Sequence, residues 1–143
     1  MPYEFLDDIA TADIAFRAWA KDLERTFVQA SEAMMNVMVE EIDSIKPREE
    51  RRVRLQNEAL DMLLFDFLQE LIYFKDSEGL LLRAREVKIA EEDSPFSLHA
   101  TVFGESIDST RHRLRVDVKA VTLHRFRLEK SDEGWEAWVI LDI

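Results

Sequence analysis

The segment from Glu58 to Lys75 constrains the fold of this chain most strongly. Its apolar side chains recur at the spacing of an α-helix and cover a broad face: Leu60, Leu63, Leu64, Phe67, Leu68, Leu71, Ile72 and Phe74. A helix with so wide an apolar face must be largely buried by other elements. The sequence Asp76-Ser77-Glu78-Gly79 predicts the end of this helix, with Gly79 as a left-handed C-terminal cap.

A second helix is predicted directly after Asp22, a residue type suited to cap a helix N-terminus. Helical spacing then continues to about Glu41 through Leu23, Phe27, Ala30, Met34, Val37 and Met38. These residues form one stripe, so we interpret the methionines in it as core residues.

The remaining segments alternate between apolar and polar residues, as strands do. They cover residues 2–6, 14–19, 49–56, 80–90, 96–103, 114–130 and 135–141. The alternation shifts phase near Lys119-Ala120, which predicts a β-bulge in one long strand. The pattern indicates an α+β fold in a single domain, residues 1–143, with two helices packed on a mostly antiparallel β-sheet.

The charge of the chain bears on its partners. Lys and Arg number 19, Asp and Glu number 30, and the net charge is −11. A field of that sign repels phosphate backbones, so we expect no direct, stable nucleic-acid binding. Residues 48–54 are the most basic stretch, but Glu49 and Glu50 interrupt the arginines and no aromatic residue lies among them. We interpret this stretch as a solvated strand.

Several classes of site are excluded because the chain lacks the residues for them. There is no Cys, no Gly-rich phosphate loop, no nucleophile elbow and no pair of His at metal-binding spacing. His99, His112 and His124 are each interpreted as surface or strand residues. Because the sequence contains no secretory signal and no apolar run of membrane-spanning length, we expect a soluble, cytoplasmic protein with no membrane partner.

Acidic residues stand out at both ends of the chain. Asp7 and Asp8 are typical of a turn, whereas Asp13 leads directly into an apolar strand, where an unpaired carboxylate is costly. At the other end, the side chain of Asp142 and the terminal carboxylate of Ile143 lie together, and such like charges repel unless a cation compensates them. Oxygen ligands of this kind suit a hard divalent cation, and Asp13 would complete the site if the last strand lay beside it.

A set of motifs spread over the whole chain resembles the archease family. The resemblance rests on Tyr3-Glu4-Phe5-Leu6-Asp7, Thr11-Ala12-Asp13 with Arg17-Ala18-Trp19, Gly104-Glu105 leading to Arg111-His112, the block from Val118 to His124, and Trp135 with the ending Val139-Ile140-Leu141-Asp142-Ile143. Asp8 stands where the family has His before Thr-Ala-Asp, and Ala20 stands where it has Gly.

The resemblance implies a non-catalytic accessory protein that activates an RtcB-type RNA ligase in tRNA splicing. Such a protein promotes GTP-dependent guanylylation of the ligase and its multiple turnover. Carried over to this sequence, Asp13, Asp142 and the Ile143 carboxylate match the divalent-cation site, with Ca²⁺ favoured and Mg²⁺ or Mn²⁺ as alternatives. Lys119 matches a residue implicated in ligase activation, and Asp8 and His124 are further candidates.

Three alternatives remain open from the residues. The first is a chaperone or modulator of tRNA-modifying enzymes such as a tRNA methyltransferase, which the same resemblance implies. The second is a metal-dependent hydrolase built on Asp13 and Asp142, with His124 as its base. In the third, the acids merely protect an exposed sheet edge from pairing with other chains.

Overall fold

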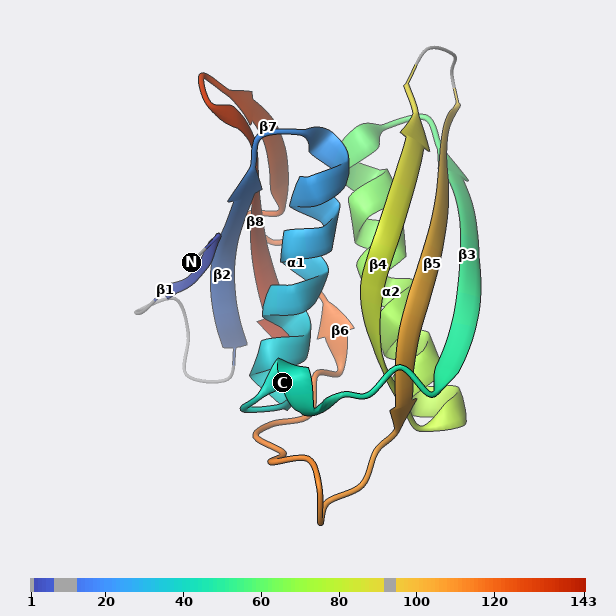
Figure 1. The fold of residues 1–143 in the computed structure, drawn as a ribbon. Coiled ribbons are helices and arrows are strands. Elements are labelled where there is room, and N and C mark those ends of the chain that lie inside the picture. The colour runs from blue at the N-terminus through green and yellow to red at the C-terminus, as the bar shows by residue number, and fades with distance from the viewer. Residues whose placement is uncertain (1, 7–12, 92–94) are drawn as a thin grey trace.

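The computed structural model describes residues 2–6, 13–91 and 95–143, and it contains two long helices and eight strands (Figure 1). Their bounds in chain order are β1 (Tyr3–Leu6), β2 (Asp13–Ala20), α1 (Leu23–Met38), a short 3₁₀ helix (Ile42–Ser44), β3 (Glu49–Asn57), α2 (Leu60–Glu78), β4 (Leu80–Ala90), β5 (Phe96–Ser106), β6 (Ala120–Val121), β7 (Arg127–Ser131) and β8 (Gly134–Asp142). The α+β prediction is confirmed. No helix among the described residues is long and apolar enough to cross a membrane.

The helix termini follow the predicted capping residues. The Asp22 carboxylate accepts a hydrogen bond from the Arg25 backbone N–H at 2.7 Å, as an N-cap does. Gly79 closes α2 in the left-handed region at φ 68° and ψ 30°, and its N–H donates to the Lys75 carbonyl at 3.0 Å. Helix α2 begins at Leu60, two residues later than the predicted Glu58, and it continues to Glu78, beyond the predicted Lys75.

The strands form two antiparallel sheets, where the sequence predicted one. The first has the order β1-β2-β8-β6, with β7 also paired to β8, and the second has the order β3-β5-β4. Helix α1 packs against β2 and β8 of the first sheet and against β4 of the second. Helix α2 covers the inner face of the second sheet and reaches β6 and β7 (Figure 1).

One hydrophobic core joins both helices and both sheets, as the broad apolar face of α2 requires. The largest fully buried side chains come from α1, α2 and all layers around them: Phe16, Phe27, Met34, Met35, Leu63, Leu64, Phe67, Leu68, Leu71, Leu81, Leu82 and Leu98. Close packing of this kind fixes the strand ends, where the candidate site residues lie.

The prediction of one strand over residues 114–130 is wrong. Residues 107–119 run outside the two sheets, β6 has only two residues, and a turn containing Arg125 at φ 53° separates it from β7. Part of this segment instead pairs with the chain after α1: the Glu40 N–H donates to the Arg113 carbonyl at 2.8 Å, and the Arg115 N–H to Met38 at 2.8 Å. Alternation of residue types showed extended backbone here but could not show its pairing partner.

Candidate functional site

Asp13 and Asp142 lie directly opposite each other in the antiparallel pair of β2 and β8. Their neighbours in the register, Ile14 opposite Leu141, face the core, so the two aspartates project from the other face of the sheet. Directly opposed Cβ atoms are about 4.5–5.5 Å apart. The fold therefore brings together the two acids that the sequence singled out at opposite ends of the chain.

This pair of carboxylates takes part in no ion pair among the described residues. No Lys, Arg or His of that part of the chain forms an ion pair with Asp13 or Asp142. Residues 7–12, Asp-Asp-Ile-Ala-Thr-Ala, contain no basic side chain either. Like charges directly opposite each other destabilise a strand pair, and an oxygen-preferring cation would relieve that repulsion. The donor chemistry thus fits a divalent cation.

The backbone of Lys119 meets the same strand end from the other side. Its N–H donates to the Asp142 carbonyl at 2.8 Å, and Ala120 is the direct partner of Asp142 in the β6–β8 pair. The Lys119 side chain is exposed. Strand β8 therefore lies between Asp13 and the Lys119 segment, so three of the predicted residues share one end of the sheet.

The other predicted residues are placed less closely. Within residues 2–6, 13–91 and 95–143, no group of three or more His, Cys, Asp and Glu side chains could hold a metal ion. Asp8 lies outside the described residues. His124 lies in the exposed turn after β6, and no strand pairing puts it beside Asp13 or Asp142. Ile143 directly follows Asp142 and is half-buried.

A buried ion cluster, which sequence reasoning missed, anchors the start of the 107–119 segment. Glu105 is 5% exposed and accepts hydrogen bonds from the Lys46 backbone N–H at 2.8 Å and from His112 Nε2 at 2.9 Å. It also pairs with Arg111 and, at 3.3 Å, with Arg48. Burial by itself raises the pKa of Glu105, but these donors more than offset it and hold that pKa at about 2.

His112 corrects our interpretation of it as a surface residue, because it is only 1% exposed. The Asp108 backbone N–H donates to its Nδ1 at 3.0 Å, so the proton of the neutral imidazole lies on Nε2 and points to Glu105. The available signal was the spacing of Gly104-Glu105 before Arg111-His112. Gly104 is required here, since a Cβ would overlap the Leu81 carbonyl oxygen.

The end of the same segment is held by Lys75, in the last turn of α2. Its Nζ is buried and donates to Asp76 at 2.6 Å and to Asp117 at 2.5 Å. Burial lowers the pKa of Lys75, but the hydrogen bonds to Asp117 and Asp76 more than compensate and leave that pKa above its ordinary value. Asp117 closely precedes Lys119, so this contact also fixes the approach of Lys119 to β8.

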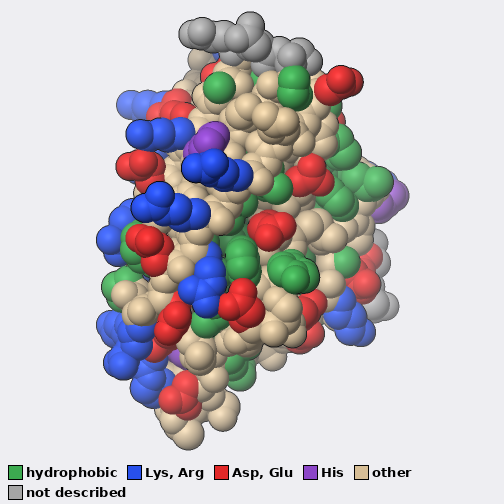
Figure 2. All heavy atoms as spheres, turned by 90° about the vertical axis from the view of Figure 1, so that its right-hand side faces the viewer, with side chains coloured by type: hydrophobic (Ala, Val, Ile, Leu, Met, Phe, Trp, Pro, Cys, Tyr) green, Lys and Arg blue, Asp and Glu red, His purple; other side chains and the backbone are tan. Residues whose placement is uncertain are grey.

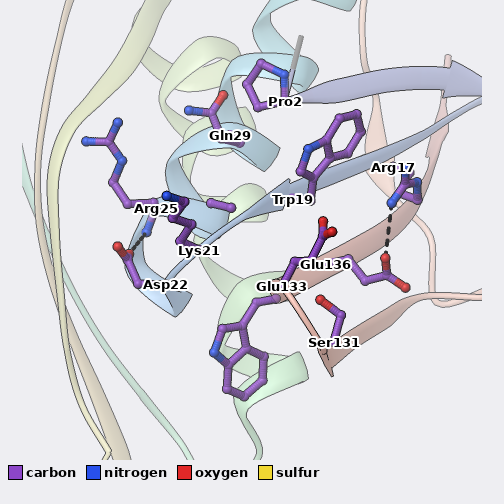
Figure 3. Close-up of a pocket in the computed structure, with 12 residues that line it drawn as sticks. Pro2, Arg17, Trp19, Lys21, Asp22, Arg25, Gln29, Ser131, Glu133 and Glu136 are labelled. Atoms are coloured by element: carbon purple, nitrogen blue, oxygen red, sulfur yellow. Dashed lines mark hydrogen bonds and ion pairs between the residues drawn. The ribbon is translucent and has the colours of Figure 1, made fainter.

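A cavity of about 960 Å³ lies at the opposite end of β2 (Figure 3). Trp19, Lys21, Arg25 and Glu133 are among its lining residues, and Arg17 donates to Glu136 at 3.1 Å on one wall. Because Trp19 pairs with Glu136 at the far end of the β2–β8 register, this cavity is separate from Asp13 and Asp142.

Comparisons with known proteins bear on the family of the chain. The model of the Archease protein family matches residues 3–143. Protein archease of Methanothermobacter thermautotrophicus is 40% identical over 141 residues, covering 99% of this chain and 98% of that protein. Protein archease of Pyrococcus abyssi is 37% identical over 134 residues, with 93% and 94% covered.

Two solved structures are similar as well. The solution structure of protein 1598 from Methanobacterium thermoautotrophicum has a TM-score of 0.85 and 38% identity, with 99% of both chains covered. The crystal structure from Thermotoga maritima, described as an archease and possible chaperone, has a TM-score of 0.58 and 21% identity, with 94% and 93% covered; it supports the fold alone. With the family model matching nearly from end to end, this chain belongs to the archease family.

Proposed function

We propose that this protein is a cytoplasmic, non-catalytic accessory factor of an RtcB-type RNA ligase in tRNA splicing. It promotes GTP-dependent guanylylation of the ligase and supports its multiple turnover. Membership of the archease family supports an activator or chaperone role. The observation that carries the proposal is the direct opposition of the half-buried Asp13 and Asp142 at one strand end, next to the exposed Lys119.

In this proposal, the side chains of Asp13 and Asp142 and the terminal carboxylate of Ile143 hold one divalent cation. The ligand atoms are all oxygens, which suit hard divalent cations; we expect Ca²⁺, with Mg²⁺ or Mn²⁺ as alternatives. When bound, the cation supplies a positive centre that attracts phosphate and carboxylate oxygens. The two aspartates orient that centre toward the partner, since they project away from the core.

The mechanism places the Asp13–Asp142 end against the nucleotide-loaded site of the ligase. The exposed Lys119 side chain lies next to this end and contacts the partner there, while the 107–119 segment keeps its backbone in position. A net charge of −11 favours association with a basic, RNA-binding enzyme and affects mainly the association rate and the specificity.

Guanylylation of the purified ligase by GTP tests the proposal. Asp13→Ala and Asp142→Ala are each expected to reduce the stimulation of ligase–GMP formation at least tenfold. Asp132→Ala is the matched control, because it removes an exposed acid from the β7–β8 turn, at the other end of β8. Undiminished stimulation by both site variants would refute the proposal.

A chaperone or modulator of a tRNA methyltransferase is the second candidate. Four large apolar side chains are exposed in or close to the 107–119 segment: Ile107 at 37%, Leu114 at 47%, Val116 at 39% and Leu123 at 63%. Exposed apolar groups of this kind suit contact with another protein. This function should be unchanged by chelators and by Asp13→Ala, whereas ligase activation should be lost in both cases.

A further inference from the structure

The outer face of the β3-β5-β4 sheet carries a cluster of basic side chains. They point away from the core because successive residues of a strand face opposite sides of the sheet. Val53, Ala100 and Val87 are buried in one register row, and the rows on either side of it face outward. In one outward row, Arg54 of β3 and Lys88 of β4 each lie directly opposite His99 of β5. We call Arg52, Arg54, Arg85, Lys88 and His99 the basic face.

Arg85 joins the basic face through an irregularity in β4. The register shifts between Ala84 and Glu86, so Arg85 is the extra residue of a bulge. Its guanidinium lies over the Phe103 ring, 4.1 Å from the ring centroid. A bulge commonly re-aims a side chain, and here it adds a cation to the outer face.

These cations are left largely uncompensated. Among the described residues, Arg52, Arg54 and Arg85 form no ion pair, and Lys88 has only a 3.6 Å contact with Glu86 of its own strand. Arg54 and Lys88 lie on either side of His99, and among the described residues no acid of a neighbouring strand forms an ion pair with either of them. A bound anion would therefore stabilise this arrangement.

The basic face is also hollowed. A groove of about 450 Å³ is lined by Arg52, Arg54, Lys88, His99 and Thr101, with Glu86 at its side. Figure 2 shows Lys and Arg side chains gathered along one side of the molecule, the side on which this sheet lies in Figure 1. The basic side chains and the groove therefore lie on the same surface.

The polarity of the face favours a nucleic acid over a protein as its occupant. Among the described residues, the exposed large apolar side chains are Phe5, Tyr73, Ile107, Leu114, Val116 and Leu123, and none belongs to β3, β4 or β5. Protein interfaces rely on buried aromatic or aliphatic anchors, whereas nucleic-acid interfaces are polar and positively charged.

We propose that the basic face binds the phosphodiester backbone of RNA. The three arginine guanidinium groups match phosphate oxygens, and Thr101, Ser97 and Gln56 on the same face can donate to phosphate or ribose. Among the described residues of the face no Phe, Tyr or Trp is exposed and His99 is the one exposed ring, so phosphate contacts dominate and we expect little sequence preference. The choice of RNA over DNA rests on the proposed function.

This inference refines the expectation drawn from the net charge of −11. Salt screens charges beyond about 10 Å at 0.1 M. The acids elsewhere on the molecule therefore slow the association of RNA more than they weaken its contacts with the basic face. Binding by the free protein is therefore weak, and it becomes useful when the partner enzyme holds the RNA at a high effective concentration.

The test measures fluorescence anisotropy of a labelled 20-nucleotide oligouridylate with the free protein at several salt concentrations. Four contacting cations predict a slope of log K against log salt of about −3. Arg52→Glu/Arg54→Glu/Lys88→Glu should weaken binding at least tenfold and flatten the slope. Lys21→Glu/Arg113→Glu/Lys130→Glu is the matched control, since it changes the net charge equally at exposed positions elsewhere and should cost under threefold.

Three results would overturn the proposal. They are equal losses in the two triple variants, no detectable RNA binding at low salt, and binding of oligoglutamate as tight as that of RNA, which would indicate an acidic protein partner. The neutral variant Arg52→Gln/Arg54→Gln/Lys88→Gln should also weaken binding. Its circular dichroism spectrum should match that of the wild type, which shows that the loss of binding does not come from misfolding.

The outcome is separable from that of the proposed function. Asp13→Ala should leave RNA binding unchanged, and the basic-face variant should still stimulate guanylylation of the ligase in the absence of RNA. Failure of one proposal therefore leaves the other intact.

Discussion

At the residue scale, the opposition of Asp13 and Asp142 ties stability to divalent cations. Without a cation, Asp13→Asn should stabilise the protein by about 0.2–1 kcal/mol, because it removes a repulsive cross-strand pair. With Ca²⁺ in excess the order should reverse, since ligand binding stabilises only the form that can bind it. Thermal unfolding of the wild type and the variant in EDTA and in Ca²⁺ measures both stability differences. A wild-type melting temperature that does not change with Ca²⁺ would contradict the cation site.

Glu105 makes a second residue-scale prediction, which concerns pH. Its ordinary pKa of 4.5 is lowered to about 2 in the folded protein, so the folded state favours the ionised carboxylate. Its stabilisation is therefore complete above about pH 4.5 and is lost as the pH falls toward 2. Urea unfolding across this range should show that loss in the wild type.

Glu105→Gln should lower the free energy of unfolding by about 1.5–3 kcal/mol at pH 7, because charge-assisted hydrogen bonds from His112 and Lys46 are weakened. It should also remove this part of the acid dependence. Glu50→Gln, an exposed acid on β3, is the matched control and should do neither. Similar effects of the two variants would mean that the buried cluster does not matter.

At the element scale, the 107–119 segment depends on side-chain anchors because it belongs to neither sheet. Asp117→Asn should free its C-terminal part from Lys75 and speed hydrogen exchange over residues 113–119. Stimulation of the ligase should fall with it, since Lys119 loses its fixed approach. Asp76→Asn is the control, because it removes the other carboxylate bound to Lys75 and leaves the segment attached. Equal exchange in both variants would refute this role.

Elements were predictable from the sequence where their signals are local. Asp22 and Gly79 mark helix ends through hydrogen bonds to nearby residues, so a capping preference is enough to locate them. The prediction of one strand from Leu114 to Lys130 was wrong, because alternation of residue types does not show which other segment the chain pairs with. Its actual partner for residues 113–115 is the chain just after α1, which no local pattern indicates.

At the scale of the whole molecule, charges separate over the surface. A chain of net charge −11 presents two opposed aspartates at one strand end and uncompensated cations on the outer face of the other sheet. Net charge averages over such differences, so the expectation of no direct, stable nucleic-acid binding that was drawn from it does not take a local basic face into account. In the proposed complex, the acidic end meets the ligase while the basic face meets its RNA.

The sequence by itself determined the fold class, the two helices and their caps, most strands, and the acids to examine, because these depend on periodicity and residue type. Only the tertiary structure decided which of those residues meet. Asp13 is brought opposite Asp142, and Arg54 and Lys88 are brought to either side of His99, by strand registers that join distant parts of the chain. Such registers are set by burial of the opposite sheet faces against α1 and α2, a condition of the whole core that no single segment carries.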